Sequence, residues 1–214
     1  MRGLFIVLIA CMVGLTACVQ QEQELQEIKL NAPDKERGSA TMQALSDRMS
    51  VREFDEKELS LQDLSDLLWA ANGVNRPDGR RTAPTASNKQ EIDVYAILPE
   101  GAYFYDAEVH SLKPVEKGDF RGLVAGSQDF VKTAPLSLVI VANLEKLGDP
   151  TVEQTKLLGS IDAGIVNQNI NLFCASIGLA NVPRASMDKA ELQNVLKLSE
   201  TRVPIMNNVL GYQK

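Results

Sequence analysis

The sequence predicts an α+β domain in which one mixed or antiparallel β-sheet packs among helices. Two kinds of periodicity indicate this class. Apolar residues occupy every second position over Ile92–Leu98, as in a half-buried strand, whereas after Ser60 they recur every three to four positions, as in an amphipathic helix. The composition agrees, because 44% of the 214 residues are hydrophobic. A single domain with a substantial core therefore fits the chain.

The predicted helices have clear ends. The residues Ser60–Asp63 match a capping box that opens one helix, Asn72–Gly73 ends it, and Gly178 closes a long helix further on. The pattern predicts four helices in all: a short one ending near Arg48, one from Ser60 to Asn72, one over Glu153–Ile177 and one over Asp188–Leu196.

The strands are expected between these helices. The segment Pro135–Ala142 is almost continuously apolar, which predicts a strand at the centre of the sheet. Val74–Asn88 has no periodicity and is expected to be a long loop, a feature that is usually functional inside a compact domain. The other predicted strands are Ile92–Leu98, Ala102–Tyr105, Ala180–Arg184 and Val203–Tyr212.

The N-terminus resembles a targeting signal. A continuous apolar run over residues 4–13 is too short for a permanent membrane helix but suits a signal peptide. The sequence Leu-Thr-Ala-Cys at 15–18 resembles a bacterial lipobox, in which cleavage precedes an acylated cysteine. We therefore expect a lipoprotein signal peptide over 1–17, a flexible tether over 18–39 and the folded domain over 40–214. An ordinary secretory signal that happens to contain Cys18 is the alternative.

The lipoprotein interpretation fixes the expected location. Acylated Cys18 would anchor the protein to a membrane of the bacterial cell envelope, with the domain facing away from the cytoplasm.

The ionisable residues exclude several classes of function. With 22 basic and 28 acidic residues the net charge is -6, and the basic residues form no stripe, so no nucleic-acid partner is expected. One histidine and three cysteines are too few for the common metal sites, so none is expected. Cys174 is expected to be a small buried hydrophobe and His110 a surface residue. The catalytic residue, if there is one, is unknown.

An alternating segment carries two cations. Arg48, Ser50 and Arg52 occupy every second position, so an extended segment would point all three the same way and Met49 and Val51 the other. Two guanidinium groups and a hydroxyl can hold a phosphate. The alternative is that Arg48 completes a helix C-terminus and Arg52 is merely solvated.

Two further segments are polar. Arg81–Gln90 ends the long loop, and its small residues allow close approach while the amides of Asn88 and Gln90 offer donors and acceptors to a planar heterocycle. Val209–Lys214 ends the chain with a glycine and a terminal cation. Taken alone, each segment can be an ordinary turn or strand end.

In this order, the three segments resemble the nitroreductase family of FMN flavoproteins. That family carries an R-x-S-x-R-type segment, then a P-S-x-x-N-x-Q-type segment and a G-Y-x-K/R-type ending. The same resemblance extends over Leu59–Gly73, Gln128–Leu136 and Asp162–Leu179. These segments look especially like the branch of the family that contains azoline dehydrogenases. It covers Ala40–Lys214, and an ordered set of weak motifs is hard to obtain by chance.

The resemblance implies a fold, a cofactor and partners. The fold would be nitroreductase-like, with three layers in the order α-β-α, and the protein would be a homodimer with two FMN sites at its interface. The activity would be that of an FMN-dependent oxidoreductase passing hydride or electrons to or from a small organic substrate, with the electron donor open. The alternative is a lipid-anchored protein that binds flavin or another small molecule without turnover.

The resemblance also assigns roles to residues. The first segment would bind the FMN phosphate and ribityl chain, the second would follow the flavin ring from the partner subunit, and the chain end would return to the phosphate. Thr85 stands where serine is usual, and Met49 where arginine or histidine is common. The implied cofactor-binding residues are Arg48, Met49, Ser50, Arg52, Pro84, Thr85, Ala86, Ser87, Asn88, Gly211 and Lys214.

Overall fold

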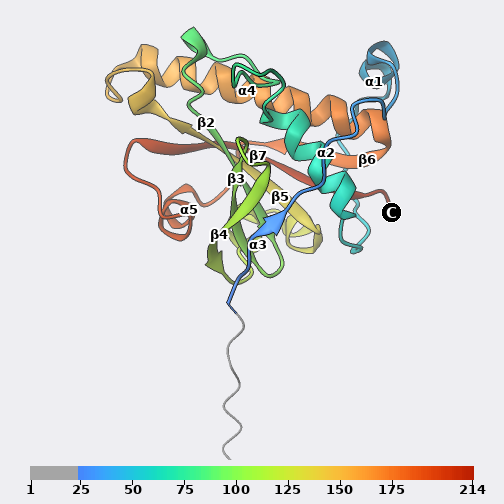
Figure 1. Ribbon diagram of the computed structural model, residues 1–214. Coiled ribbons are helices and arrows are strands. Elements are labelled where there is room, and N and C mark those ends of the chain that lie inside the picture. The colour runs from blue at the N-terminus through green and yellow to red at the C-terminus, as the bar shows by residue number, and fades with distance from the viewer. Residues whose placement is uncertain (1–23) are drawn as a thin grey trace, which may run out of the picture.

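A computed structural model describes residues 24–214 (Figure 1), so the predicted signal peptide and Cys18 lie outside the described residues. Its seven-stranded sheet has the order β1-β4-β3-β2-β5-β7-β6, and every neighbouring pair is antiparallel. The strands are β1 (Ile28–Lys29), β2 (Ile92–Leu98), β3 (Gly101–Asp106), β4 (Ser111–Lys117), β5 (Leu136–Asn143), β6 (Leu179–Arg184) and β7 (Arg202–Tyr212). Of the two sheet types that the sequence allowed, the antiparallel one is confirmed.

The four predicted helices are confirmed, with their caps. The Ser60 hydroxyl accepts a hydrogen bond from the Asp63 N–H (3.1 Å) at the start of α2, and Gly178, at φ 76°, ends α4 in the left-handed conformation. In the described part of the chain, no helix is both long and apolar enough to cross a membrane. The helices are α1 (Thr41–Asp47), α2 (Leu61–Asn72), α3 (Arg121–Ala125), α4 (Glu153–Ile177) and α5 (Lys189–Val195), with 3₁₀ turns η1 (Ala86–Asn88), η2 (Asp129–Thr133) and η3 (Leu144–Lys146).

The sheet has a core on each face. Strand β5 explains why its sequence reads as one apolar run: Leu138 and Ile140 pack toward α2 and α4, while Val139 and Val141 pack toward α3 and α5. Figure 1 shows α4 lying across one face of the sheet with α2 beside it, and α3 and α5 on the other side. The expected three-layer order α-β-α is therefore present.

The segment before α1 differs from the expected flexible tether. Ile28 and Lys29 pair with β4, the Asn31 N–H donates to the Ser65 hydroxyl (2.9 Å), and the Arg37 guanidinium contacts Asp63 and Asp66, each at 2.7 Å. These contacts fix the segment across α2. The expectation of a flexible tether over 18–39 is therefore corrected for residues 24–39, and the folded body begins before residue 40.

Two strands and one helix were not predicted. Strand β4 contains Pro114 and three charged side chains, which hide its period, and β1 is only two residues long. Helix α3 has five residues, too few for a helical pattern to show. All three elements lie at the periphery, so their absence from the prediction leaves the class of fold unchanged.

Candidate functional site

The cationic segment follows α1 directly. The Arg48 N–H still donates to the Ala44 carbonyl (3.0 Å) as the helix ends, and the Val51 N–H donates to the Asn181 carbonyl (2.9 Å) at β6. The remaining residues of the segment are exposed, with Met49 63% exposed. Among the described residues, neither Arg48 nor Arg52 forms an ion pair. Both cations are thus available to a ligand.

A pocket of about 530 Å³ opens beside this segment. It lies between the end of α1, the C-terminal part of α4 and the last residues of the chain. Its lining takes Arg48, Met49 and Val51 from the cationic segment but neither Ser50 nor Arg52. The simple alternation expected from the sequence is therefore corrected: Val51 is held toward β6 by its backbone hydrogen bond, so the segment does not divide into a polar and an apolar face.

Three asparagines form one wall of this region. Asn181 Nδ2 donates to Asn171 Oδ1 (2.5 Å), and Asn208 Nδ2 donates to the side-chain oxygens of both (3.1 and 3.2 Å). All three are buried, and Asn171 and Asn181 also line the pocket. These bonds fix how the amide groups are turned, while Asn208 Oδ1 has no hydrogen-bond partner among the described residues. The sequence analysis missed this cluster, although asparagines inside three apolar stretches were a usable signal.

The loop before β2 has an unusual backbone. Five non-glycine residues among the described ones have positive φ, and three of them are Ser87 (50°), Asn88 (54°) and Gln90 (49°). Such conformations cost free energy and persist only where surrounding contacts impose them. The Ser87 and Asn88 side chains are exposed. The Asn88 amide, assigned to the flavin ring by resemblance, is thus held out toward solvent.

Hydrogen bonds from three directions hold this loop. The Ala86 N–H donates to Asp162 Oδ2 (2.7 Å) on α4, the Gln90 N–H donates to the Thr85 hydroxyl (2.8 Å), and Lys146 Nζ donates to the Gln90 carbonyl (2.9 Å). Pro84 is exposed and Thr85 is half-buried. These hydrogen bonds hold the loop in one defined conformation, unlike an ordinary exposed turn.

A buried pair of carboxyl groups lies beneath the loop. Glu91 is fully buried and Asp162 is 5% exposed. Burial, and then contact with Asp162, raises the pKa of Glu91 to about 7. Nothing in the sequence analysis pointed to this pair, because its members are far apart in the chain.

The end of the chain is anchored as well. The Tyr212 hydroxyl donates to Asp63 Oδ2 (2.5 Å) and accepts from the Ser60 N–H (3.0 Å). A Cβ at Gly211 would lie 2.8 Å from Pro135 Cδ, so glycine is required there by close packing. Lys214 is exposed and, within residues 24–214, forms no ion pair. Its cation is free to reach a ligand near the pocket that Gln213 lines.

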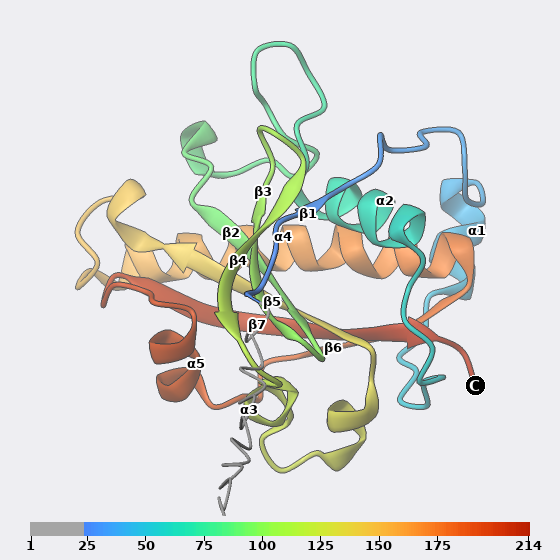
Figure 2. The same ribbon diagram turned by 60° about the horizontal axis from the view of Figure 1, so that its bottom comes forward.

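The structure does not bring the two principal segments together within one chain. The loop binds α4 at Asp162, whereas the pocket meets α4 from Asn171 onward, nine residues further on and about 14 Å along the helix axis. Figures 1 and 2 agree that the loop and α1 lie on opposite sides along α4, with the C-terminus near α1.

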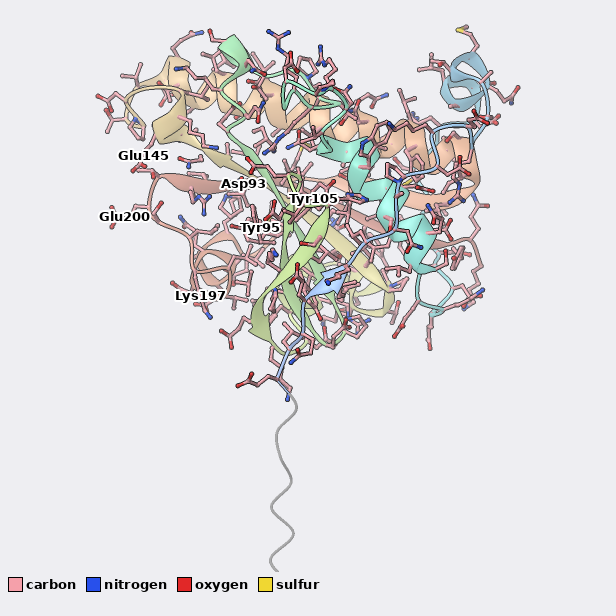
Figure 3. The ribbon with its side chains drawn as sticks, in the orientation of Figure 1. Asp93, Tyr95, Tyr105, Glu145, Lys197 and Glu200 are labelled. Atoms are coloured by element: carbon pink, nitrogen blue, oxygen red, sulfur yellow. The ribbon has the colours of Figure 1, made fainter. Side chains whose placement is uncertain are left out.

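Several other polar, aromatic and sulfur-containing side chains have structural roles. Tyr103 and Tyr105 are buried, and Figure 3 shows Tyr105 over the middle of the sheet. His110 is half-buried with Nδ1 2.9 Å from the Tyr105 hydroxyl, and burial lowers its pKa, so the expectation of a surface histidine is wrong. Burial raises the pKa of Cys174, as suits a small buried hydrophobe. No cluster of metal-ligating side chains occurs in the described part of the chain.

These features define a class of protein. An α+β domain with an antiparallel seven-stranded sheet carries cations that are unpaired among the described residues beside the C-terminal part of its long helix, and a strained, amide-bearing loop bound nearer the middle of that helix. A model of the nitroreductase family matches residues 45–212. The chain belongs to the nitroreductase family.

Individual relatives agree. The protein MJ1384 of Methanocaldococcus jannaschii, assigned to the nitroreductases, is 30% identical over 195 residues, covering 87% of this chain and 93% of its own. A Ralstonia eutropha JMP134 protein with the same assignment has a solved structure that superposes with a TM-score of 0.82 at 40% identity, covering 88% of this chain and 90% of that one. An FMN reductase [NAD(P)H] of Bacillus subtilis is 23% identical over 185 residues, covering 80% of this chain and 65% of its own.

Proposed function

We propose that the protein is an FMN-dependent oxidoreductase acting on a small organic molecule. The observation that carries the proposal is the family match over residues 45–212, within which both implied cofactor segments are open to solvent. The residues suit FMN chemically. Arg48, Arg52 and Lys214 are exposed cations without acidic partners among the described residues, and a phosphate dianion would supply those partners.

Each segment has a part in the proposed site. Arg48 and Arg52, with Ser50 and the Met49 backbone, would bind the phosphate and ribityl chain, and the Gly211–Lys214 end would add its cation. Asn88, on the strained loop, would hydrogen-bond the ring. Bound FMN supplies hydride transfer, so the chain's own residues need only orient the cofactor and the substrate and no nucleophile is required.

The same proposal requires a homodimer. The separation of about 14 Å along α4 supports a site built from the cationic segment of one chain and the loop of its partner. Apolar side chains on the outer side of α4 and on α1 are exposed and suit such an interface: Leu157 (52%), Ile161 (50%) and Met42 (77%).

The substrate and donor are proposed at the level of class. The FMN reductase of Bacillus subtilis carries NAD(P)H in its name, which supports a nicotinamide as the donor to test first. The azoline dehydrogenase-like motifs support a small heterocyclic substrate.

The proposed location is the cell envelope, with a lipid anchor at Cys18. Five residues, 19–23, separate that cysteine from residue 24, and the six steps of chain between them can span at most about 20 Å, so the domain would stay close to the membrane. Because soluble nicotinamides are not expected there, the second candidate is a lipid-anchored protein that binds flavin or another small molecule without turnover.

The experiment is a spectrum followed by a reduction. Purified protein mixed with FMN should retain flavin absorbance after gel filtration, and anaerobic NADH or NADPH should bleach it. Retained flavin that dithionite reduces but neither nucleotide does supports the cofactor and leaves the donor to be identified. Protein that retains no flavin refutes the FMN-dependent activity and favours a protein that binds another small molecule.

A further inference from the structure

We propose that Glu91 and Asp162 share one proton, and that this shared proton holds the Thr85–Gln90 loop in the strained conformation that presents Asn88. The part that concerns the flavin ring rests on the proposed function. The part that concerns the loop rests on the geometry of the chain alone.

The need for a proton follows from the chemistry of the pair. Both oxygens of Glu91 are buried without a well-aligned hydrogen-bond partner among the described residues, and the side chains that face them are the carboxyl of Asp162 and the hydroxyl of Thr85. Two ionised carboxylates are both acceptors and cannot hydrogen-bond each other. A single proton between them supplies the missing donor and removes one of two buried negative charges.

The pair is connected to both ends of the loop. Asp162 Oδ2 accepts from the Ala86 N–H at 2.7 Å, and Glu91 directly follows Gln90, whose N–H binds the Thr85 hydroxyl. The Thr85 hydroxyl also faces Glu91. The loop is thus fastened to α4 by the Ala86–Asp162 hydrogen bond at one end and by the Glu91–Asp162 contact at the other, and only the second of these contacts needs the proton.

Strain makes this fastening necessary. Ser87, Asn88 and Gln90 all have positive φ, and the loop contains no glycine that would adopt such angles freely. A loop of this kind relaxes when the contacts that impose it are weakened. Without the proton, the two carboxylates repel each other, and the Glu91 end of the loop is pushed away from α4.

Within residues 24–214, no cation is placed to offset that repulsion directly. Lys146, on η3, binds the Gln90 carbonyl (2.9 Å), and Lys89 is exposed in the loop. Asp93, two residues beyond Glu91, is almost buried, and Figure 3 shows it beside the sheet. Its carboxylate has cations of its own nearby: Arg202 (2.8 Å), Lys146 and Arg81.

The test is hydrogen exchange of the loop amides in the protein without added flavin. Between pH 6 and pH 8, the exchange protection of the Ala86 and Gln90 amides should fall about ten-fold after correction for intrinsic exchange, as the proton leaves the pair. The amide of Val139 in the central strand β5 reports global unfolding and serves as the internal control.

Two variants test whether the shared proton causes the loss of exchange protection. Glu91→Gln keeps the shape and supplies an amide donor to Asp162 at every pH, so protection should become independent of pH. Asp162→Asn supplies the donor from the other side while its Oδ1 can still accept from Ala86, and it replaces the first variant if that one does not fold. Glu145→Gln, at an exposed carboxylate on η3 (Figure 3), should behave as the wild type.

The outcomes separate this proposal from the proposed function. Wild-type protection that does not change with pH, or a decline that Glu91→Gln leaves unchanged, overturns the shared proton. Added FMN should increase the protection of the same amides at pH 6. Bound FMN that leaves these amides unaffected overturns the role of the loop at the ring, whereas failure to bind FMN refutes the proposed function and leaves the proton result standing.

Discussion

Replacing Glu91 by glutamine should change how the stability of the protein depends on pH. In the folded protein the pKa of Glu91 is about 7, compared with an ordinary value of 4.5, because of burial and then the contact with Asp162. The difference of about 2.5 pH units, at about 1.4 kcal/mol each, corresponds to about 3 kcal/mol. The folded-state pKa is raised, so this stability is fully present below pH 4.5 and is lost as the pH rises through 7.

Urea denaturation of the flavin-free protein at pH 5, 6, 7 and 8 measures this effect. The wild type should lose most of the 3 kcal/mol over that range, while Glu91→Gln has no group to ionise and should lose far less. Burial lowers the pKa of His110, which also makes stability depend on pH, but this residue is present in both proteins and cancels in the difference between the two curves. Glu145→Gln, exposed at η3, is the matched control and should follow the wild type. Parallel curves for wild type and Glu91→Gln would refute the reasoning.

Three further predictions concern the proposed site and anchor. Arg48→Ala and Arg52→Ala should each weaken FMN binding about ten- to a hundred-fold, measured by flavin fluorescence, because each removes a charge-assisted contact to phosphate. Lys132→Ala, which removes an exposed ion pair on η2, is the control. Wild-type affinity in both arginine variants would contradict phosphate binding by this segment. Asn88→Ala should still bind FMN but shift its midpoint potential, and an unchanged potential and reduction rate would place the ring elsewhere. Cys18→Ser should release the protein from membranes or block its processing, and unchanged retention after normal cleavage would defeat the lipid anchor.

The parts of the fold that the sequence predicted are those with local signals. Ser60 caps α2 and Gly178 closes α4 through chemistry that belongs to single residues, and β5 is apolar throughout because both of its faces are covered. The weak elements β1, β4 and α3 lack such signals. The packing of residues 24–39 was missed because it depends on Arg37, whose partners Asp63 and Asp66 lie more than twenty residues away.

The candidate site also has parts that the sequence predicted and parts that it could not predict. The cationic segment and the Asn88 loop were found through motifs, but their separation along α4 is a tertiary property that no motif carries. Glu91 and Asp162 meet only because β2 begins beneath the middle of α4, so their contact could not be predicted from spacing. The positive φ angles of the loop are likewise invisible in a sequence without glycine at those positions.

The central claim is that each flavin site combines two chains, and a mixed dimer tests it most directly. Chains carrying Arg48→Ala with Arg52→Ala, and chains carrying Asn88→Ala, are given different affinity tags, co-expressed and purified through both tags. A composite site predicts that one of the two sites is wild type, so the tightly bound flavin, one per dimer, should have the wild-type midpoint potential. If the tightly bound flavin instead has the potential of the Asn88→Ala protein, the site lies within a single chain and the account is contradicted.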